Sequence, residues 1–217
     1  MGTVIKNDSL RNWLIRYSFY FSGLVCFALG VAISVKMQHL GVHPWDVLNI
    51  ALFERFGLSI GIWTVIIGFM LITVSLFVGR KYVNLGTFLN ALLIGPIMDF
   101  FLWLDVLPTA SFAWTDYVWL LVGIVIVGIG GGLYVSGGIG AGPRDGFMLS
   151  MAERTGLSVS KARIVVECSV LLVGYVLGGP VFLVTFLYTF IMSPIFQLSL
   201  KVFTRLKDEL CHSFPGR

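Results

Sequence analysis

The chain has 217 residues and a formal net charge of +4. Hydrophobic residues make up 57% of it and charged residues 12%, against roughly 45–50% and about 25% in an ordinary soluble domain. This composition excludes a soluble globular domain and indicates an integral membrane protein, with the lipid bilayer as its first partner.

Six apolar stretches follow one another along the chain. Each approaches the ~20 residues needed to cross about 30 Å of hydrocarbon. Four contain no charged residue, whereas the third and the fifth each contain an embedded acid, Asp99 and Glu167. The stretches are 17–35, 60–78, 83–104, 118–135, 159–177 and 181–200. The sequence therefore predicts an all-α polytopic membrane protein with six transmembrane helices.

The positions of the 15 Lys and Arg residues predict the orientation of these helices. With the N-terminus in the cytoplasm, 13 of them fall on the inner side and only Lys36 and Arg55 on the outer side. The loop 105–116 contains no basic residue, as expected of an outer loop. We therefore expect both termini in the cytoplasm. The net positive charge then reflects membrane topology, and nucleic acid is not an expected partner.

A long segment of the chain occurs twice. Residues 44–59, PWDVLNIALFERFGLS, return as residues 143–158, PRDGFMLSMAERTGLS, after a shift of 99 positions. Residues 87–97 return as residues 185–195 after a shift of 98. A repeat that keeps its spacing this closely indicates two copies of one ancestral unit.

The two copies predict the organisation of the whole chain. We expect a single transmembrane domain, 1–200, with repeat 1 at about 12–106, repeat 2 at about 117–200, and a cytoplasmic tail at 201–217. Each copy contains three spans. Because three is odd, the second copy enters the membrane from the opposite side. The copies are therefore predicted to be inverted about an axis in the membrane plane.

A short helix is predicted inside each copy, between its first and second spans. Glycine-containing breaks precede Pro44 and Pro143, which suit the first position of a helix. Asp46 and Asp145 fall in the first turn, where a carboxylate favours the positive end of the helix dipole. Each segment is about 12 residues or roughly 18 Å long, too short to span. It is either a re-entrant half-helix that starts inside the bilayer or an interfacial helix that lies flat.

The candidate site residues lie in these repeated segments and at polar positions inside the spans. A charge inside a membrane is expensive and usually functional. However, capping of their own helices is the favoured role for Asp46 and Asp145, and Glu167 could pair with Arg163 one turn earlier. The candidates for a substrate path are His43, Pro44, Trp45, Asp46, Asn90, Asp99, Pro143, Arg144, Asp145, Glu167, Tyr188 and Gln197. The sequence shows no catalytic set, metal-ligand spacing or nucleotide motif. We therefore expect no enzyme activity, no metal and no cofactor.

The elements GVHPWD with GLSIG, GTFLNALLIGPIMD, and GAGPRDG with GLS resemble the YczE/YyaS/YitT family of bacterial integral membrane proteins. The resemblance covers about residues 12–200. It implies a polytopic protein of the bacterial plasma membrane. It implies neither a substrate nor a set of site residues.

Three functions fit this organisation. Inverted repeats with broken helices favour a secondary transporter or exporter of a small polar or anionic metabolite, driven by a gradient. A passive channel of aquaporin-like design is the second, because six spans and two opposed half-helices also suit a pore. The third is a non-transporting accessory or regulatory membrane protein. A small solute is the expected partner for the first two, and the sequence leaves a homo-oligomer open.

Overall fold

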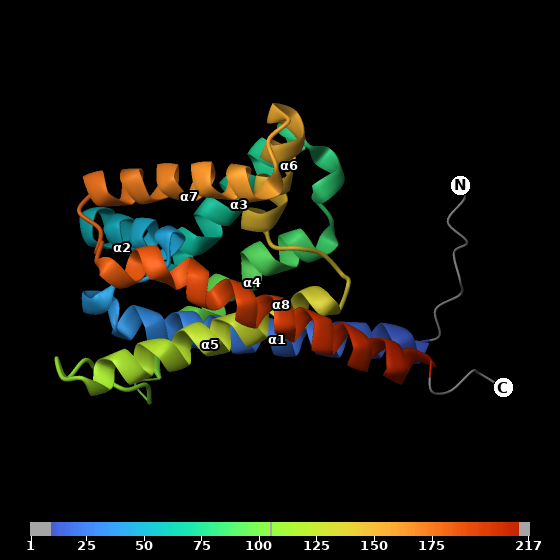
Figure 1. Ribbon diagram of the computed structural model, residues 1–217, viewed down its shortest axis with the longest axis horizontal. Coiled ribbons are helices and arrows are strands. Elements are labelled where there is room, and N and C mark those ends of the chain that lie inside the picture. Colours follow the sequence, from blue (N-terminus) through green and yellow to red (C-terminus); the bar gives the residue numbers. More distant parts are fainter. Residues whose placement is uncertain (1–9, 105, 213–217) are drawn as a thin grey trace.

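The computed structural model describes residues 10–104 and 106–212. In that part of the chain every regular element is a helix, which confirms the all-α prediction (Figure 1). In chain order they are α1 Leu10–Lys36, η1 Gln38–Leu40, α2 Pro44–Phe56, α3 Ile60–Val78, η2 Arg80–Tyr82, α4 Leu85–Trp103, α5 Thr115–Ser136, α6 Pro143–Thr155, α7 Val159–Val176 and α8 Leu183–His212. The two η elements are short 3-10 helices.

Five of these helices are long and apolar enough to cross a membrane, namely α1, α3, α4, α5 and α8. The helix α7 is 18 residues long but carries Lys161, Arg163 and Glu167, so the sixth span stays a prediction. The helix α8 continues to His212 through residues predicted as a tail, because 201–212 contains neither Gly nor Pro. The rest of the predicted tail, 213–217, lies outside the described residues.

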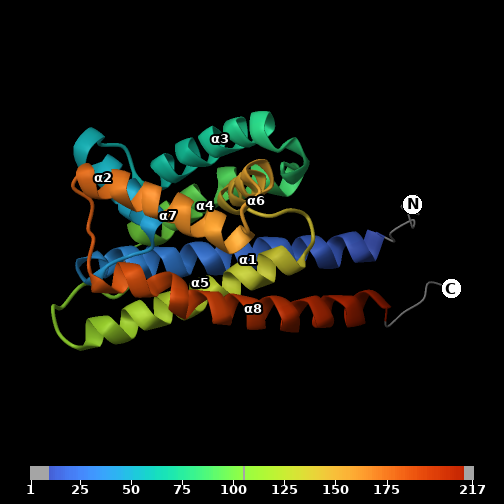
Figure 2. The ribbon, with the colours of Figure 1, turned by 45° about the horizontal axis from the view of Figure 1, so that its top comes forward.

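The helices α1, α5 and α8 lie side by side along the long axis of the molecule (Figure 1, Figure 2). The chain runs through α1 and α5 in opposite directions, as the colours in both views show. The short helix α2 packs against α7, and the short helix α6 packs against α3. Similarly, α1 contacts α4 and α5 contacts α8. Helices at corresponding places in the two halves therefore make corresponding contacts.

The helices α1 and α5 cross closely because glycines occupy the contact. A Cβ atom added at Gly23 would overlap the backbone of Tyr134, and one added at Gly130 would overlap the backbone of Phe27. Small residues at such a crossing let two helix backbones approach and gain van der Waals contact. The close crossing also holds Tyr134 beside the interior of the molecule, where its hydroxyl takes part in the site described below.

Both short helices begin and end where the sequence predicts. Pro44 and Pro143 occupy their first positions, and Gly57 and Gly156 adopt positive φ angles of 74° and 70° just after their last residues. Such angles are easily adopted by glycine. Ser59 accepts a hydrogen bond from the Ile62 N–H and so caps α3, as the repeated Gly-Leu-Ser element suits.

The short helices are buried at their N-terminal ends and exposed at their C-terminal ends. In α2, Trp45 is buried, whereas Phe56 is 61% exposed. In α6, Pro143 is buried and Thr155 is exposed. The first turn of each helix therefore lies inside the molecule, and the last turn lies at its surface.

Candidate functional site

A cavity of about 190 Å³ lies where the first turns of α2 and α6 meet α7 and α8. All eight α-helices contribute lining side chains. Since about 10–15 Å³ of such space is enough to hold one water, the cavity has room for several waters or for a small metabolite. The polar lining includes His43, Trp45, Asp46, Asn90, Tyr134, Arg144, Asp145, Arg163, Glu167, Tyr188 and Gln197.

One ion pair joins the two copies of the repeated segment across this cavity. The Nη2 atom of Arg144 lies 3.4 Å from Oδ1 of Asp46. The guanidinium group of Arg144 also lies over the Trp45 ring, 5.3 Å from its centre, within the range of a cation–π contact. A carboxylate as buried as Asp46 needs such a partner to remain charged.

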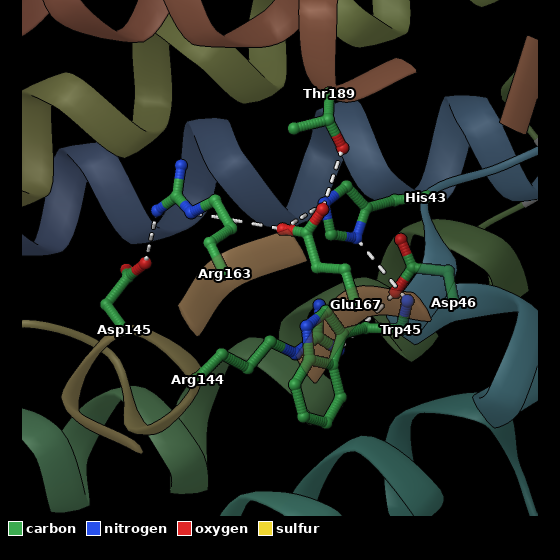
Figure 3. Close-up of polar contacts among 8 residues, drawn as sticks. All are labelled: His43, Trp45, Asp46, Arg144, Asp145, Arg163, Glu167 and Thr189. Atoms are coloured by element: carbon green, nitrogen blue, oxygen red, sulfur yellow. Dashed lines mark hydrogen bonds and ion pairs between the residues drawn. The ribbon is translucent and has the colours of Figure 1, made fainter. Parts of the chain in front are cut away.

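Arg163 of α7 holds two further carboxylates (Figure 3). Its Nη2 atom lies 3.2 Å from Oδ1 of Asp145, and its Nε atom lies 3.9 Å from Oε1 of Glu167. Glu167 in addition accepts a hydrogen bond of 3.2 Å from the Thr189 hydroxyl on α8. The ion pairs and this hydrogen bond therefore connect α6, α7 and α8 around the same cavity.

His43 connects the start of α2 to this group. Its Nδ1 atom accepts the backbone N–H of Trp45 at 3.4 Å, which places the proton of a neutral ring on Nε2. That Nε2 atom lies 4.0 Å from Oε1 of Glu167. His43 is therefore the residue that caps α2, and it directs its remaining N–H toward a carboxylate.

The prediction that Asp46 and Asp145 cap their own helices is wrong. His43 caps α2, and Gly142, which has no side chain, stands at the same position before α6. Both aspartates instead pair with arginines. Their place in the first helical turn serves to bring the carboxylates to the cavity.

Ten of the twelve predicted path residues line the cavity. They are His43, Trp45, Asp46, Asn90, Pro143, Arg144, Asp145, Glu167, Tyr188 and Gln197. Pro44 occupies the first position of α2 but does not line the cavity. Asp99 lies elsewhere: it accepts hydrogen bonds from the Ser59 hydroxyl and, at 2.9 Å, from the Gly61 N–H. Asp99 thus ties α4 to the first turn of α3.

Arg163 and Tyr134 are the main lining residues outside the predicted set. The spacing of four residues predicts the pair of Arg163 with Glu167, which the structure confirms, but it does not predict the contact of Arg163 with Asp145. The hydroxyl of Tyr134 donates to Oδ2 of Asp145 at 3.4 Å, but nothing in the sequence of its apolar helix distinguishes this tyrosine.

The predicted membrane orientation counts both Arg144 and Arg163 as charges that flank the spans, although both line the cavity. Without them the split of basic residues is still 11 to 2.

Two guanidinium groups, three carboxylates and the first turns of two helices thus surround one cavity. Such groups bind polar or charged solutes through charge-assisted hydrogen bonds and through the helix dipole. Among residues 10–104 and 106–212, no three His, Cys, Asp or Glu side chains are grouped to hold a metal ion.

These features define an all-helical membrane protein with a charged internal cavity between two short helices. The chain belongs to the family of unknown function DUF6198, whose model matches residues 14–201. It is 36% identical over 187 residues to the uncharacterized membrane protein YczE of Bacillus subtilis, with 86% of each chain covered. An uncharacterized protein of Haemophilus influenzae is 33% identical over 174 residues, which cover 79% of this chain and 78% of that protein.

The uncharacterized protein YyaS of Bacillus subtilis is 24% identical over 170 residues, which cover 77% of this chain and 83% of that protein. These matches confirm the resemblance to YczE and YyaS. No solved structure matches the chain.

Proposed function

We propose that this protein is a secondary transporter that moves a small polar or anionic metabolite across the bacterial plasma membrane, with both termini in the cytoplasm. The observation that carries the proposal is the meeting of both copies of the repeated segment at one charged cavity. Charged side chains are rarely kept inside membrane proteins without a functional reason. The cavity residues bind and release the solute and carry out no covalent chemistry.

The positions that line the cavity support two inverted repeats. Seven pairs of lining residues are related by the repeat shift of 99 or 98 positions: His43 with Gly142, Trp45 with Arg144, Asp46 with Asp145, Thr64 with Arg163, Gly68 with Glu167, Asn90 with Tyr188, and Ile94 with Met192. A two-fold axis through the cavity would produce this pairing. The opposite directions of α1 and α5 favour an axis perpendicular to them, hence in the membrane plane.

The burial of α2 and α6 favours re-entrant helices over interfacial ones. A helix that lies flat on a membrane exposes one face along its whole length, whereas these two are buried at one end and exposed at the other. A re-entrant arrangement points the positive end of each helix dipole at the cavity. Discontinuous helices of this kind bind solutes in many secondary transporters.

The ionic contacts favour a carrier over an open channel. Asp46 belongs to the first copy and Arg144 to the second, so their contact joins the halves across the path. A carrier that alternates between two states must exchange such contacts. The channel remains the second candidate, because two helix N-termini that face one cavity also suit a pore.

Reconstitution into liposomes on a solid-supported membrane tests the proposal. Concentration jumps of small organic anions, cations and neutral polar solutes are applied to the full chain. We expect transient currents or counterflow that saturate with one solute class and disappear in Asp46→Asn. The matched control is Glu153→Gln, because Glu153 lies at the surface and pairs with Lys81 at 2.5 Å. Flux that rises linearly with concentration would favour the channel. Absence of flux for every class would favour the accessory role.

A further inference from the structure

The cavity contains hydrogen-bond donors that no acceptor satisfies. Within the part of the chain that the structure describes, three buried polar atoms of its lining residues have no hydrogen-bond partner. They are Nε1 of Trp45, Nδ2 of Asn90 and Nε of Arg163. Trp45 and Asn90 are only 2% and 5% exposed. All three atoms are N–H donors, so the group that satisfies them carries acceptors.

The three carboxylates of the cavity, in contrast, each already have a donor. Asp46 accepts from Arg144, Asp145 accepts from Arg163 and Tyr134, and Glu167 accepts from Thr189. The first turn of α6 adds backbone N–H groups that no side chain caps, whereas the first N–H groups of α2 bond to His43. A bound ammonium group would add donors to a site that already has an excess of them. A carboxylate would supply the acceptors that these donors lack.

Most of the remaining lining is apolar, and it determines which solute body fits the cavity. Side chains of Phe27, Val31, Ile94, Met192 and Phe196 face the same cavity. Apolar walls with a few convergent polar groups bind a solute that has an apolar body and one polar end. A sugar or a short dicarboxylate would leave these walls unmatched.

We propose that the transported solute is a small monocarboxylate with a short aliphatic or aromatic body, bound through its carboxylate to Trp45, Asn90 and Arg163. This inference rests on the proposed function, because it names the substrate class of the same cavity. Arg163 contributes charge, while the indole and the amide contribute direction.

From the charges around the cavity we also infer that the anion binds together with about one proton. Three carboxylates and two arginines face it, and the hydrogen bond that Nδ1 of His43 accepts from the Trp45 N–H favours the neutral form of this ring. Their formal sum is −1, and two helix N-termini contribute roughly +0.5 each, so the empty site is close to neutral. A bound monocarboxylate leaves about one negative charge in excess, which one proton shared by the carboxylates removes. The titratable and charged groups that face this site are His43, Asp46, Tyr134, Arg144, Asp145, Arg163, Glu167 and Tyr188.

Isothermal titration calorimetry of the purified full chain in micelles tests the substrate class. The probes are butyrate, benzoate and phenylacetate, each compared with the amide and the amine of the same carbon skeleton. We expect at least one carboxylate to bind tenfold or more tightly than its amide and its amine. Titration in two buffers of different ionisation enthalpy should report an uptake of about one proton per bound anion. Equal or tighter binding of an amine or amide, binding without proton uptake, or no binding by any carboxylate would overturn the inference.

Two variants test the unsatisfied donors. Trp45→Phe keeps an aromatic ring but removes Nε1–H, and Asn90→Leu keeps a similar shape but removes the amide. Because each removes one hydrogen bond to a charged group, we expect roughly tenfold or greater loss of carboxylate affinity. The matched control is Trp63→Phe, since Nε1 of Trp63 donates to the Gly57 carbonyl outside the cavity at 2.8 Å. If both Trp45→Phe and Asn90→Leu bind as the unchanged chain does, the donor assignment is wrong.

The same probes separate this inference from the proposed transport. Tight carboxylate binding without flux in liposomes would refute transport and leave the binding inference standing. Saturable flux of an amine, with no carboxylate binding, would refute the inference and leave transport standing.

Discussion

The pair Asp46–Arg144 gives the sharpest quantitative prediction, because it links the two halves inside the cavity. Removal of either partner alone leaves the other as an unpaired charge, whereas removal of both does not. A double-mutant cycle with Asp46→Asn, Arg144→Gln and the double variant therefore isolates their coupling. The two substitutions keep the side-chain shapes close to the original ones.

The expected magnitude follows from distance and burial. At 3.4 Å and an effective dielectric constant of about 20, the attraction is roughly 5 kcal/mol. Breaking a fully buried pair costs about 3–5 kcal/mol. The side chain of Arg144 is 22% exposed and that of Asp46 only 4%, so Arg144 can turn toward the cavity when left alone. We expect costs of about 2 kcal/mol for Asp46→Asn and about 3 kcal/mol for Arg144→Gln.

The double variant should cost about 3 kcal/mol, which leaves a coupling energy of roughly 2 kcal/mol. Reversible unfolding of the full chain in mixed micelles measures all three changes. Thermal midpoints should fall by about 2–4 °C for each kcal/mol lost. Additivity of the two single costs to within about 0.5 kcal/mol would refute the reasoning. A larger cost for Asp46→Asn than for Arg144→Gln would contradict the burial assignment.

Three further predictions concern the helices around the site. Cysteines introduced at Phe56 and Thr155, in a chain whose native cysteines are replaced, should react with an impermeant maleimide from opposite sides of the membrane; reaction from one side would exclude inverted copies. Gly23→Ala should lower stability by about 1–3 kcal/mol, because its Cβ would overlap the facing helix, whereas the exposed control Ser22→Ala should be neutral in the same melting assay. Asp99→Asn should lower stability by about 1.5 kcal/mol while solute affinity in calorimetry stays unchanged, and a loss of affinity would place Asp99 in the binding site.

Much of the fold can be predicted from the sequence because the residues that begin and end a helix act locally. Pro44, Gly57 and Ser59 each act within one turn, so the beginnings and ends of α2 and α3 follow from spacing alone. The far end of α8 is different. Composition becomes polar at Lys201, but the helix continues to His212 since polarity marks the edge of the apolar region and not the end of the helix.

Only those residues of the site that lie at repeated positions can be predicted from the sequence. The repeat identifies equivalent positions, and those proved to line one cavity. It does not tell which face of a helix a side chain occupies. Tyr134 is therefore not predicted as a site residue. Asp99 is predicted as a candidate because its hydrogen-bond partner Ser59, forty residues earlier in the chain, cannot be recognised from the sequence. Both depend on contacts between helices, which no local pattern records.

The contact between Trp45 and Arg144 has a consequence for how such a protein arises. In the proposed inverted arrangement these two residues occupy the same position in the two copies, so each meets its own counterpart across the axis. In a dimer of identical half-length chains that position would meet itself, and neither two arginines nor two tryptophans could form a cation–π pair. Joining the halves into one chain lets each side of the axis evolve separately. A single chain also always contains one copy that carries Trp45 and one copy that carries Arg144.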